Sequence, residues 1–448
     1  MASIVGALAR IKQLSLGPVQ RSAVEGICRE LGHHWRHREL DPTTTLALFI
    51  QQVIHGNAPC SEVRHLAVGD FSASAYCQAR ARLPLAVYQT LLSKVTEALL
   101  PQSQRIENLW HGHRTFHIDG SSFSMPDTPQ LRRAFGTPSE QRPGCGFPVA
   151  HLLVLFNAPT GLLLDAWASP LVSGDLADTG NAHGHLQAGD VLIGDDNFSG
   201  YPHLALLLQA NLHGLFPVHH HRLVDFTPNR PHAALREEAS GLPHSRWIKS
   251  LGEDDQLVEY FRSNRKPRWM TPEQCEALPE SIVVRELRRT VDRPGGGKMT
   301  LTLVTTLLDP VLYPAKELTM LRLRRWDVET RIGELKTTMK MDVLHCKSES
   351  GVRKELAVFC LVYNLVRAVM LEAARRQQVA VARISFADTL KWMRHAKAAD
   401  LLPDLLINPS RHNRIEPRAV KRRPKKYDRL TRPRAVRREE LKKQRETS

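Results

Sequence analysis

Apolar residues recur at helical spacing through the first hundred positions of the chain. The stretches 43–55 and 85–100 carry this pattern most clearly. Residues three and four apart share one face of a helix, so both stretches predict amphipathic helices. We therefore predict a helical, DNA-binding N-terminal domain over residues 1–108. Between the two helices, the basic run 74–82 fits DNA contact, and it fits a plain helical bundle nearly as well.

From about residue 113 the pattern changes to the alternation and short apolar runs of strands. The predicted elements are strands over 114–119, 147–156 and 161–167, a polar helix-capable stretch to about 187, a strand over 190–195, a helix over 201–211 and a strand over 214–218. This order predicts an α/β fold in which helices cover a mixed sheet. We assign residues 109–221 to the first part of that core.

Residues 222–312 interrupt this order. The segments 247–261 and 282–308 alternate like antiparallel strands, which predicts a β-rich insertion. The glycine-containing loop 293–298 lacks the leading Gly and the following Ser or Thr of a P-loop. Helical patterns return in a second part of the core at 313–405, with helices over 321–336 and 352–376. The apolar run 356–371 is too short to cross a bilayer, so it predicts a buried helix and no membrane partner.

The charge of the chain points to a polyanionic partner. The 448 residues suffice for two or three domains and carry a formal net charge of +16. Residues 411–448 hold 16 Lys and Arg and 5 Asp and Glu, and their densest basic run is 421–426. With few apolar residues to bury, this tail, placed at 406–448, is predicted to be disordered alone and to contact nucleic acid. The alternatives are that the basic tail keeps the protein soluble or that it is a targeting signal.

Cysteine usage and the N-terminus bear on location. The seven cysteines are scattered and form no Cys-x-x-Cys pair, which argues against a disulfide framework or a cysteine zinc site. The first ten residues lack the basic start and apolar core of a signal peptide. The expected location is therefore the cytoplasm.

One face of the helix predicted at 321–336 surrounds a single acid with cations. At about 100° per residue, Arg322, Arg325 and Lys336 lie within about 40° of Glu329. Such a face suits a phosphodiester held beside a metal-bound carboxylate. A solvated basic helix is the alternative interpretation of the segment taken alone.

Two further acids follow predicted strands. Asp119 closes the first strand and Asp195 closes the fourth, and strand ends are where ligands bind in such sheets. With Glu329 they make three carboxylates from three elements, which suits Mg²⁺ and a pair of ions about 4 Å apart. Any one of these acids, taken alone, is better explained as a structural residue than as a catalytic one. Adjacent residues of an extended segment point to opposite sides, so we expect Asp195 rather than Asp196 to join Asp119.

The residues around the first two acids resemble a known family. Ile118-Asp119-Gly120, followed by Pro-Asp-Thr-Pro at 126–129 and by Gly-Cys-Gly-Phe-Pro at 144–148, looks like the first-acid region of the DDE transposases of insertion-sequence family four. The stretch 193–201 looks like the second, with Asp195 as the acid and Asp196 where the family usually has Arg. The resemblance covers most of the chain and implies an RNase H-like catalytic core.

The spacing signature of the third region is the most specific part of this resemblance. Arg325, Glu329 and Lys336 match the last three letters of the family's Tyr-(2)-Arg-(3)-Glu-(6)-Lys pattern, and Arg322 stands at the Tyr position. The basic segment 417–426 also looks like the family's C-terminal tail. On this resemblance, residues 222–312 are an insertion within the core, between the second acid and Glu329.

The resemblance implies a transposase that binds terminal inverted repeats of an insertion sequence, cleaves DNA and joins the freed 3′-hydroxyl to target DNA. It implies catalytic and metal-binding roles for Asp119, Asp195 and Glu329, with two Mg²⁺ ions for which Mn²⁺ could substitute. It implies DNA contacts from Arg322, Arg325, Trp326 and Lys336. Trp326 could stack on a displaced base or simply pack the helix. The implied partners are double-stranded DNA and a second copy of the chain, in the prokaryotic nucleoid.

Two functions remain as alternatives: a nuclease that cuts without joining, and a DNA-binding protein whose catalytic site is inactive. The Gly194-Asp-Asp196 sequence resembles a polymerase turn, but nothing else supports a polymerase.

His219, His220 and His221 suggest a metal site. On a strand, however, neighbours alternate faces, so we predict a polar rim or a phosphate contact instead.

Overall fold

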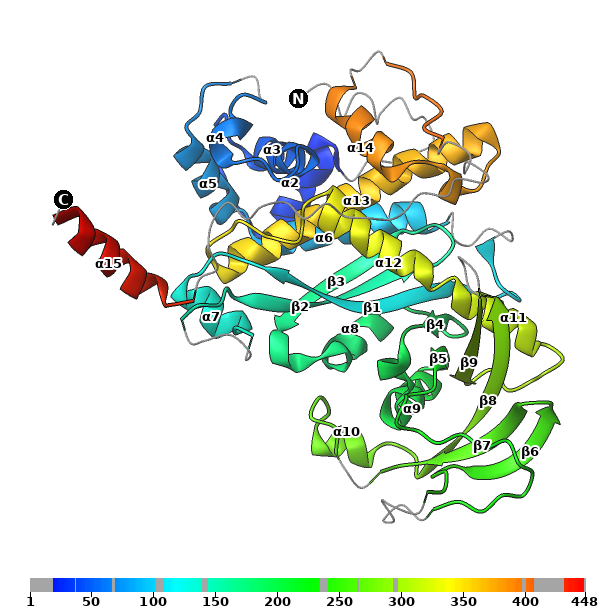
Figure 1. Cartoon of the computed structure of the whole chain (residues 1–448). Coiled ribbons are helices and arrows are strands. Elements are labelled where there is room, and N and C mark those ends of the chain that lie inside the picture. The colour runs from blue at the N-terminus through cyan, green and yellow to red at the C-terminus, as the bar shows by residue number, and fades with distance from the viewer. Residues whose placement is uncertain are drawn as a thin grey trace.

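A computed structural model describes residues 19–36, 38–66, 69–101, 108–138, 144–233, 241–263, 266–292, 297–396, 400–406 and 431–446. Its centre is a nine-stranded sheet with helices on both faces (Figure 1). The first ten residues, the basic run 421–426 and the tail segment 417–426 lie outside the described residues, as do positions 293–296 of the glycine loop.

The strand order of the sheet is β3-β2-β1-β4-β5-β9-β8-β7-β6. β1 pairs antiparallel with β2 and parallel with β4, and β4 is parallel to β5. The half from β3 to β5 has the order and directions of an RNase H-like core, so the predicted fold class is confirmed. The strands are β1 Thr115–Ser124, β2 Val149–Asn157, β3 Leu163–Pro170, β4 Val191–Ile193, β5 His213–Pro217, β6 Arg246–Gly252, β7 Asp255–Phe261, β8 Ser281–Asp292 and β9 Lys298–Thr305.

Helices fill the N-terminal region and flank the sheet. The predicted helices at 43–55 and 85–100 form as α3 and α6. Asp41 caps α3 by accepting a 2.7 Å hydrogen bond from the Thr44 N–H, and Pro84 precedes α6. The described helices are α2 Arg21–Glu30, α3 Pro42–Ile54, α4 Cys60–Val63, α5 Ala73–Arg82, α6 Leu85–Leu99, α7 Pro129–Phe135, α8 Thr179–His183, α9 Tyr201–Gln209, α10 Pro272–Glu276, α11 Ala315–Leu323, α12 Trp326–Gly333, α13 Glu349–Gln377, α14 Phe386–His395 and α15 Arg434–Glu446.

Two hydrophobic cores lie on opposite faces of the sheet. On one face, inward residues of β1–β3 pack with α13, which also packs against α3 and α6. On the other face, residues such as Phe116 and Ile118 pack with α9 (Figure 1). α13 is long and apolar enough to cross a membrane, but 94% of its most apolar stretch is buried within the protein. It is the central helix of a globular core, as its sequence predicted.

The β-rich insertion continues the core sheet. β9 pairs antiparallel with β5, with Leu215 opposite Thr305, and β8, β7 and β6 follow outward. Arg285 is fully buried and forms a bidentate ion pair with Asp255, which ties β7 to β8. A buried pair of this kind holds because both charges are hydrogen-bonded. The insertion is therefore fixed to a strand of the core.

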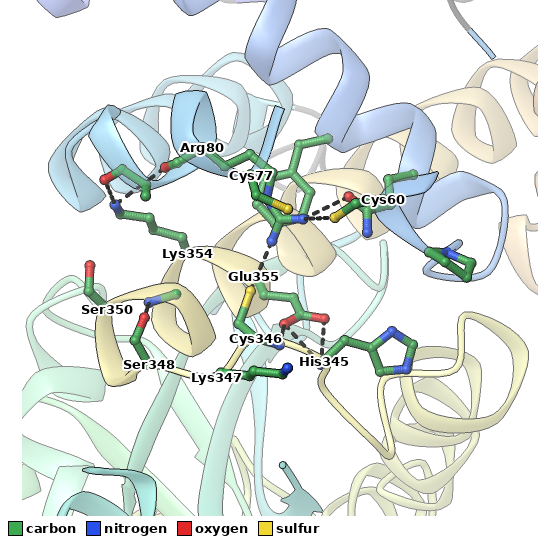
Figure 2. A pocket seen from close by; sticks show the side chains of 15 residues that line it. Cys60, Cys77, Arg80, His345, Cys346, Lys347, Ser348, Ser350, Lys354 and Glu355 are labelled. Carbon is green, nitrogen blue, oxygen red and sulfur yellow. Dashed lines mark hydrogen bonds between the residues drawn. The ribbon is translucent and has the colours of Figure 1, made fainter. Parts of the chain in front are cut away.

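A buried polar cluster joins the N-terminal helices to α13. The Glu355 carboxylate accepts hydrogen bonds from Asn57 Nδ2 at 2.6 Å and from the backbone N–H groups of His345 and Cys346. Arg80 of α5 donates to Cys346 Sγ at 2.9 Å (Figure 2). These residues line a cavity of about 590 Å³ between α3, α5 and the start of α13. The cluster makes the N-terminal region part of the core structure.

One expectation about helices was wrong. The single helix predicted at 321–336 is broken: α11 ends at Leu323, Arg324 and Arg325 form a turn, α12 follows, and a π-helical turn, η7, spans Glu334–Thr338. The tail was predicted to be disordered when alone, which stays a prediction; within the protein its last part forms α15, which projects from the body (Figure 1). The base of α15 is held by Arg434, which pairs with Asp127 at 2.7 Å and lies 4.0 Å over the Phe147 ring.

Candidate active site

Asp119 lies inside β1, not at the strand end that the sequence suggested. β1 continues five residues past it, pairing with β2 on one side. On the other side β4 stops at Ile193, whose partner is His117. Continuing that register by two residues brings Asp195 level with Asp119. The shortness of β4 therefore leaves an open edge where the two carboxylates face the same space.

Asp195 begins the turn that follows β4. Its carboxylate accepts a 3.0 Å hydrogen bond from the Asn197 N–H and a longer one from Asn197 Nδ2. Burial, together with the nearby Asp119 and Asp175 carboxylates, raises its pKa to about 6. Negative charge is therefore concentrated at this point.

Glu329 reaches the same space from α12. Its side chain is 59% exposed. Two residues on, the buried guanidinium of Arg331 donates to the carbonyl oxygens of Asn157 and Ala158 at 3.2 and 2.5 Å. Those carbonyls are at the end of β2. Arg331 thereby anchors α12 to the sheet and fixes where Glu329 stands.

Arg325 connects two of the three acids. It donates to Asp119 Oδ2 at 2.9 Å and to Glu329 Oε1 at 2.9 Å, and its side chain is 14% exposed. Burial raises the pKa of Asp119, and the Arg325 charge opposes that shift. Asp119 thus contacts the cation shared with Glu329 and interacts electrostatically with Asp195. The structure therefore brings the three sequence-predicted acids into one region, although their carboxylate oxygens do not all lie within 4.8 Å of one another.

Arg322 was predicted to share one helix face with Glu329, but it is buried. The break between α11 and α12 turns it inward, where it is 7% exposed. Burial lowers its pKa to about 10, as does the neighbouring Arg325, while the carboxylates of Asp195, Asp119 and Asp196 favour its charge. Its buried Nε has no hydrogen-bond partner among the described residues. A cation with unused donors therefore lies directly behind the acids.

Lys336 and Trp326 flank the acids along the same segment. Lys336, in the π-helical turn, donates to Ser121 Oγ at 3.1 Å, two residues beyond Asp119 on the same face of β1. Trp326 is 44% exposed at the start of α12. Lys336 is therefore placed near Asp119 as a cation, and Trp326 presents an exposed aromatic surface three residues before Glu329.

Asp175 is a fourth carboxylate that the sequence analysis missed. It accepts a 2.7 Å hydrogen bond from His151 Nε2 and one from Asn197 Nδ2, the amide that also contacts Asp195. The His151 hydrogen bond holds the pKa of Asp175 below its usual value. A Cβ on Gly120 would lie 1.8 Å from Asp175 Oδ1, so only glycine admits this approach. The glycine that follows Asp119 was the one feature of the sequence that could have indicated this approach of Asp175.

Asp195 interacts electrostatically with Asp119, and the choice of Asp195 over Asp196 as the catalytic acid stays a prediction. Asp196 begins the short 3-10 helix η6 (Asp196–Ser199) and contacts the histidines. Its Oδ2 lies 3.3 Å from His220 Nδ1. The three histidines were expected to alternate on a strand, but β5 ends at Pro217 and they lie beyond it. Their rings are neighbours, with centroids 4.3 Å apart for His219 and His220 and 4.0 Å for His220 and His221. The argument from strand alternation was therefore wrong.

The donor set suits a hard divalent cation. Asp119, Asp195 and Glu329 offer carboxylate oxygens, the ligands that Mg²⁺ prefers. A cation would also relieve the repulsion that raises the pKa of Asp195. The cations at Arg322, Arg325 and Lys336 surround the same space and suit a phosphodiester.

Comparison with known proteins places this chain in a family. Residues 110–365 match the model of the transposase DDE domain, whose members use a divalent metal ion. The chain is 27% identical over 381 residues to the transposase InsG for insertion sequence element IS4 of Escherichia coli K12, covering 79% of this chain and 77% of that protein. It is 33% identical over 99 residues to the putative transposase InsZ of the same organism, covering 22% of this chain and 32% of that protein.

Among solved structures, a piggyBac transposase synaptic complex with hairpin DNA aligns over 88% of this chain and 80% of that one, with 7% identity and a TM-score of 0.43. That likeness is too low to carry a conclusion. The family match alone spans more than half of the chain and includes all three acids. The chain is therefore a DDE transposase of insertion-sequence family four.

Proposed function

We propose that Asp119, Asp195 and Glu329 are the catalytic carboxylates of this transposase and that together they hold two Mg²⁺ ions. The observation that carries this proposal is the Arg325 bridge between Asp119 and Glu329, beside an Asp195 whose pKa is raised to about 6. Bound there, the ions would activate the attacking oxygen and stabilise the leaving one. Arg325 must release at least one carboxylate for this to happen, and a DNA phosphate is the natural new partner for its guanidinium.

The reaction proposed is cleavage at the terminal inverted repeats followed by strand transfer. Water attacks the phosphodiester at the transposon end, and the P–O3′ bond breaks to free a 3′-hydroxyl. That hydroxyl then attacks a phosphodiester of target DNA or of the opposite strand; a new P–O3′ bond forms, the attacked strand's own P–O3′ bond breaks, and its 3′-oxygen leaves as a free 3′-hydroxyl. Arg322, Arg325 and Lys336 bind the phosphates around the cut, and Trp326 stacks on a displaced base. Two copies of the chain act together, one at each end, in the nucleoid.

The test is a cleavage and strand-transfer assay on labelled duplexes that carry the element's ends, with Mg²⁺, with Mn²⁺ or with neither. Asp119→Asn, Asp195→Asn and Glu329→Gln should each slow cleavage at least about a thousandfold, equivalent to about 4 kcal/mol. Their DNA affinity should stay near normal. The matched control is Asp196→Asn, which should cleave normally in Mg²⁺ with no transition-metal ion present.

Three outcomes would contradict the proposal. Normal cleavage by any of the three variants would remove that residue from the catalytic set. Loss of cleavage in Asp196→Asn with normal cleavage in Asp195→Asn would exchange the two roles. Cleavage without any joined product would leave a nuclease instead of a strand transferase.

A further inference from the structure

The turn after β5 gathers side chains that the catalytic site does not use. His219, His220 and His221 follow the end of β5, and their rings pack on one another. The turn directs the imidazoles to one side, because the alternation of a strand no longer applies. Neighbouring imidazoles can therefore lie on the same side of the chain, which neighbouring residues of a strand cannot do.

Asp196 completes this cluster with a carboxylate. Its Oδ2 lies 3.3 Å from His220 Nδ1. One ligand atom from each of Asp196, His219 and His220 lies within 4.8 Å of the other two, and the described part of the chain holds no other group of three His, Cys, Asp or Glu residues that close. The three side chains belong to two separate segments, η6 (Asp196–Ser199) and the turn after β5.

A buried hydroxyl holds these two segments together. Ser199 is 3% exposed; its Oγ donates to the Asp196 carbonyl oxygen at 2.7 Å and accepts from the His219 N–H at 3.2 Å. The backbones that carry the three side chains are thus fixed independently of any ion. Two contacts oppose ligation. The hydrogen bond from His220 Nδ1 to Asp196 Oδ2 joins two of the proposed ligands, and an ion between them would replace it. The His221 N–H lies 3.3 Å from His219 Nδ1, and an ion bound through His219 would displace it.

We propose that Asp196, His219 and His220 form a binding site for a first-row transition-metal ion such as Zn²⁺ or Co²⁺, separate from the Asp119, Asp195 and Glu329 site. Two imidazoles and one carboxylate suit these ions, whereas Mg²⁺ prefers an all-oxygen shell. Because Asp196 adjoins Asp195, an ion bound here restrains the turn that carries the second catalytic acid. The catalytic acids would therefore adjoin a second metal site that prefers different ions.

The experiment titrates full-length protein with Co²⁺ in excess Mg²⁺ and follows the visible absorption that Co²⁺ gains from nitrogen and carboxylate ligands. Wild-type protein should bind one Co²⁺ with this signature. His219→Ala, His220→Ala and the near-isosteric Asp196→Asn should each weaken binding about tenfold or more. His221→Ala is the matched control and should bind Co²⁺ normally. Melting curves identify any variant that is unfolded. If the histidine variants are unfolded, the Co²⁺ affinity of Asp196→Asn decides the test.

The two metal sites are distinguished by a second set of variants. Asp195→Asn and Glu329→Gln should keep the Co²⁺ signature even if they abolish cleavage. If they lose it, Co²⁺ is bound at the catalytic acids and the proposal is wrong. If His221→Ala loses as much Co²⁺ affinity as His220→Ala, the three histidines bind Co²⁺ without a defined ligand set. That result would also overturn the proposal. Failure of the cleavage assay for the three acids leaves this test unchanged.

Discussion

At the scale of single residues, the buried charge of Asp195 has a measurable consequence. Its carboxyl group is partly buried beside Asp119 and Asp175, and its pKa is about 6. A group whose pKa is higher in the folded than in the unfolded state stabilises the fold in its protonated form. That stability is complete below the unfolded-state pKa and is lost as pH rises through the folded-state pKa.

Asp195→Asn should therefore raise the melting temperature of metal-free protein above pH 6, because it removes the cost of the buried charge. The gain should shrink as pH falls from about 6 toward the ordinary value of 3.8. Thermal melts of both proteins at several pH values in EDTA measure the difference. Added Mg²⁺ should reduce the gain at pH 8, since it neutralises the same charge. A gain that is constant with pH would show that the charge is not responsible.

Gly120 offers a second test at this scale. In Gly120→Ala the new methyl group meets the Asp175 carboxylate, which must move and release Asn197 and its hold on Asp195. Misplacement of about 1 Å at a reacting group can cost about a hundredfold in rate. We expect a loss of that order in cleavage rate with unchanged DNA affinity. Gly180→Ala, where a Cβ meets nothing within 4 Å, is the control and should cleave normally.

Single residues also mark what the sequence could and could not reveal. Asp195 follows a strand as predicted and Glu329 belongs to a spacing signature, whereas Asp119 was identified although its strand continues five residues past it. Asp175 lies in a polar stretch with no periodicity, and it reaches the acids only because the folded chain lays that stretch against β1. No local pattern records such a contact.

At the scale of elements, the segment 315–338 shows why a helical wheel was insufficient. The wheel assumed one continuous helix, and the chain has no proline there to signal a break. The turn at Arg324 and Arg325 instead directs Arg322 inward and Arg325 to the acids. The existence of helices was predictable, whereas the break was decided by tertiary packing.

Arg331→Met tests how α12 is held. The change keeps the apolar bulk but leaves the carbonyls of Asn157 and Ala158 without their donor. Unsatisfied buried acceptors of this kind should lower the free energy of unfolding by about 2–4 kcal/mol. Cleavage should also fall, because Glu329 loses its support. Arg324→Met, at an exposed position of the same segment, should change stability by less than about 0.5 kcal/mol. Equal effects of the two changes would rule out the anchoring role.

At the scale of the whole molecule, the sheet is larger than the sequence indicated. The individual strands of the insertion were visible in the alternation of residues 247–261 and 282–308. Their union with the core depends on β9 pairing with β5 across some 90 positions of chain. Pairing over such separations leaves no trace in a single sequence, so the insertion was foreseen as a unit but not as a continuation of the catalytic sheet.

The tail is the largest electrostatic feature of the chain and gives a prediction on this scale. Deleting residues 411–448 removes a net charge of +11 and the α15 anchor on Asp127. Binding through phosphate contacts weakens with salt, with a slope of about −0.9 per phosphate neutralised. The truncated protein should therefore show a flatter salt dependence and weaker binding to any DNA, while its preference for the element's ends persists. A full salt slope with lost end preference would make the tail a specificity element.

The position of α13 also governs how the protein is made. The N-terminal helices leave the ribosome first, yet the surface that buries α3 and α6 lies on residues 349–377, which are synthesised after all three acids. Until then the nascent chain exposes apolar faces with nothing to cover them. A gene copy that ends before codon 377 loses the centre of the core, not a peripheral module. Shortened copies should therefore be degraded or aggregate, and should not persist as DNA-binding competitors of the intact protein.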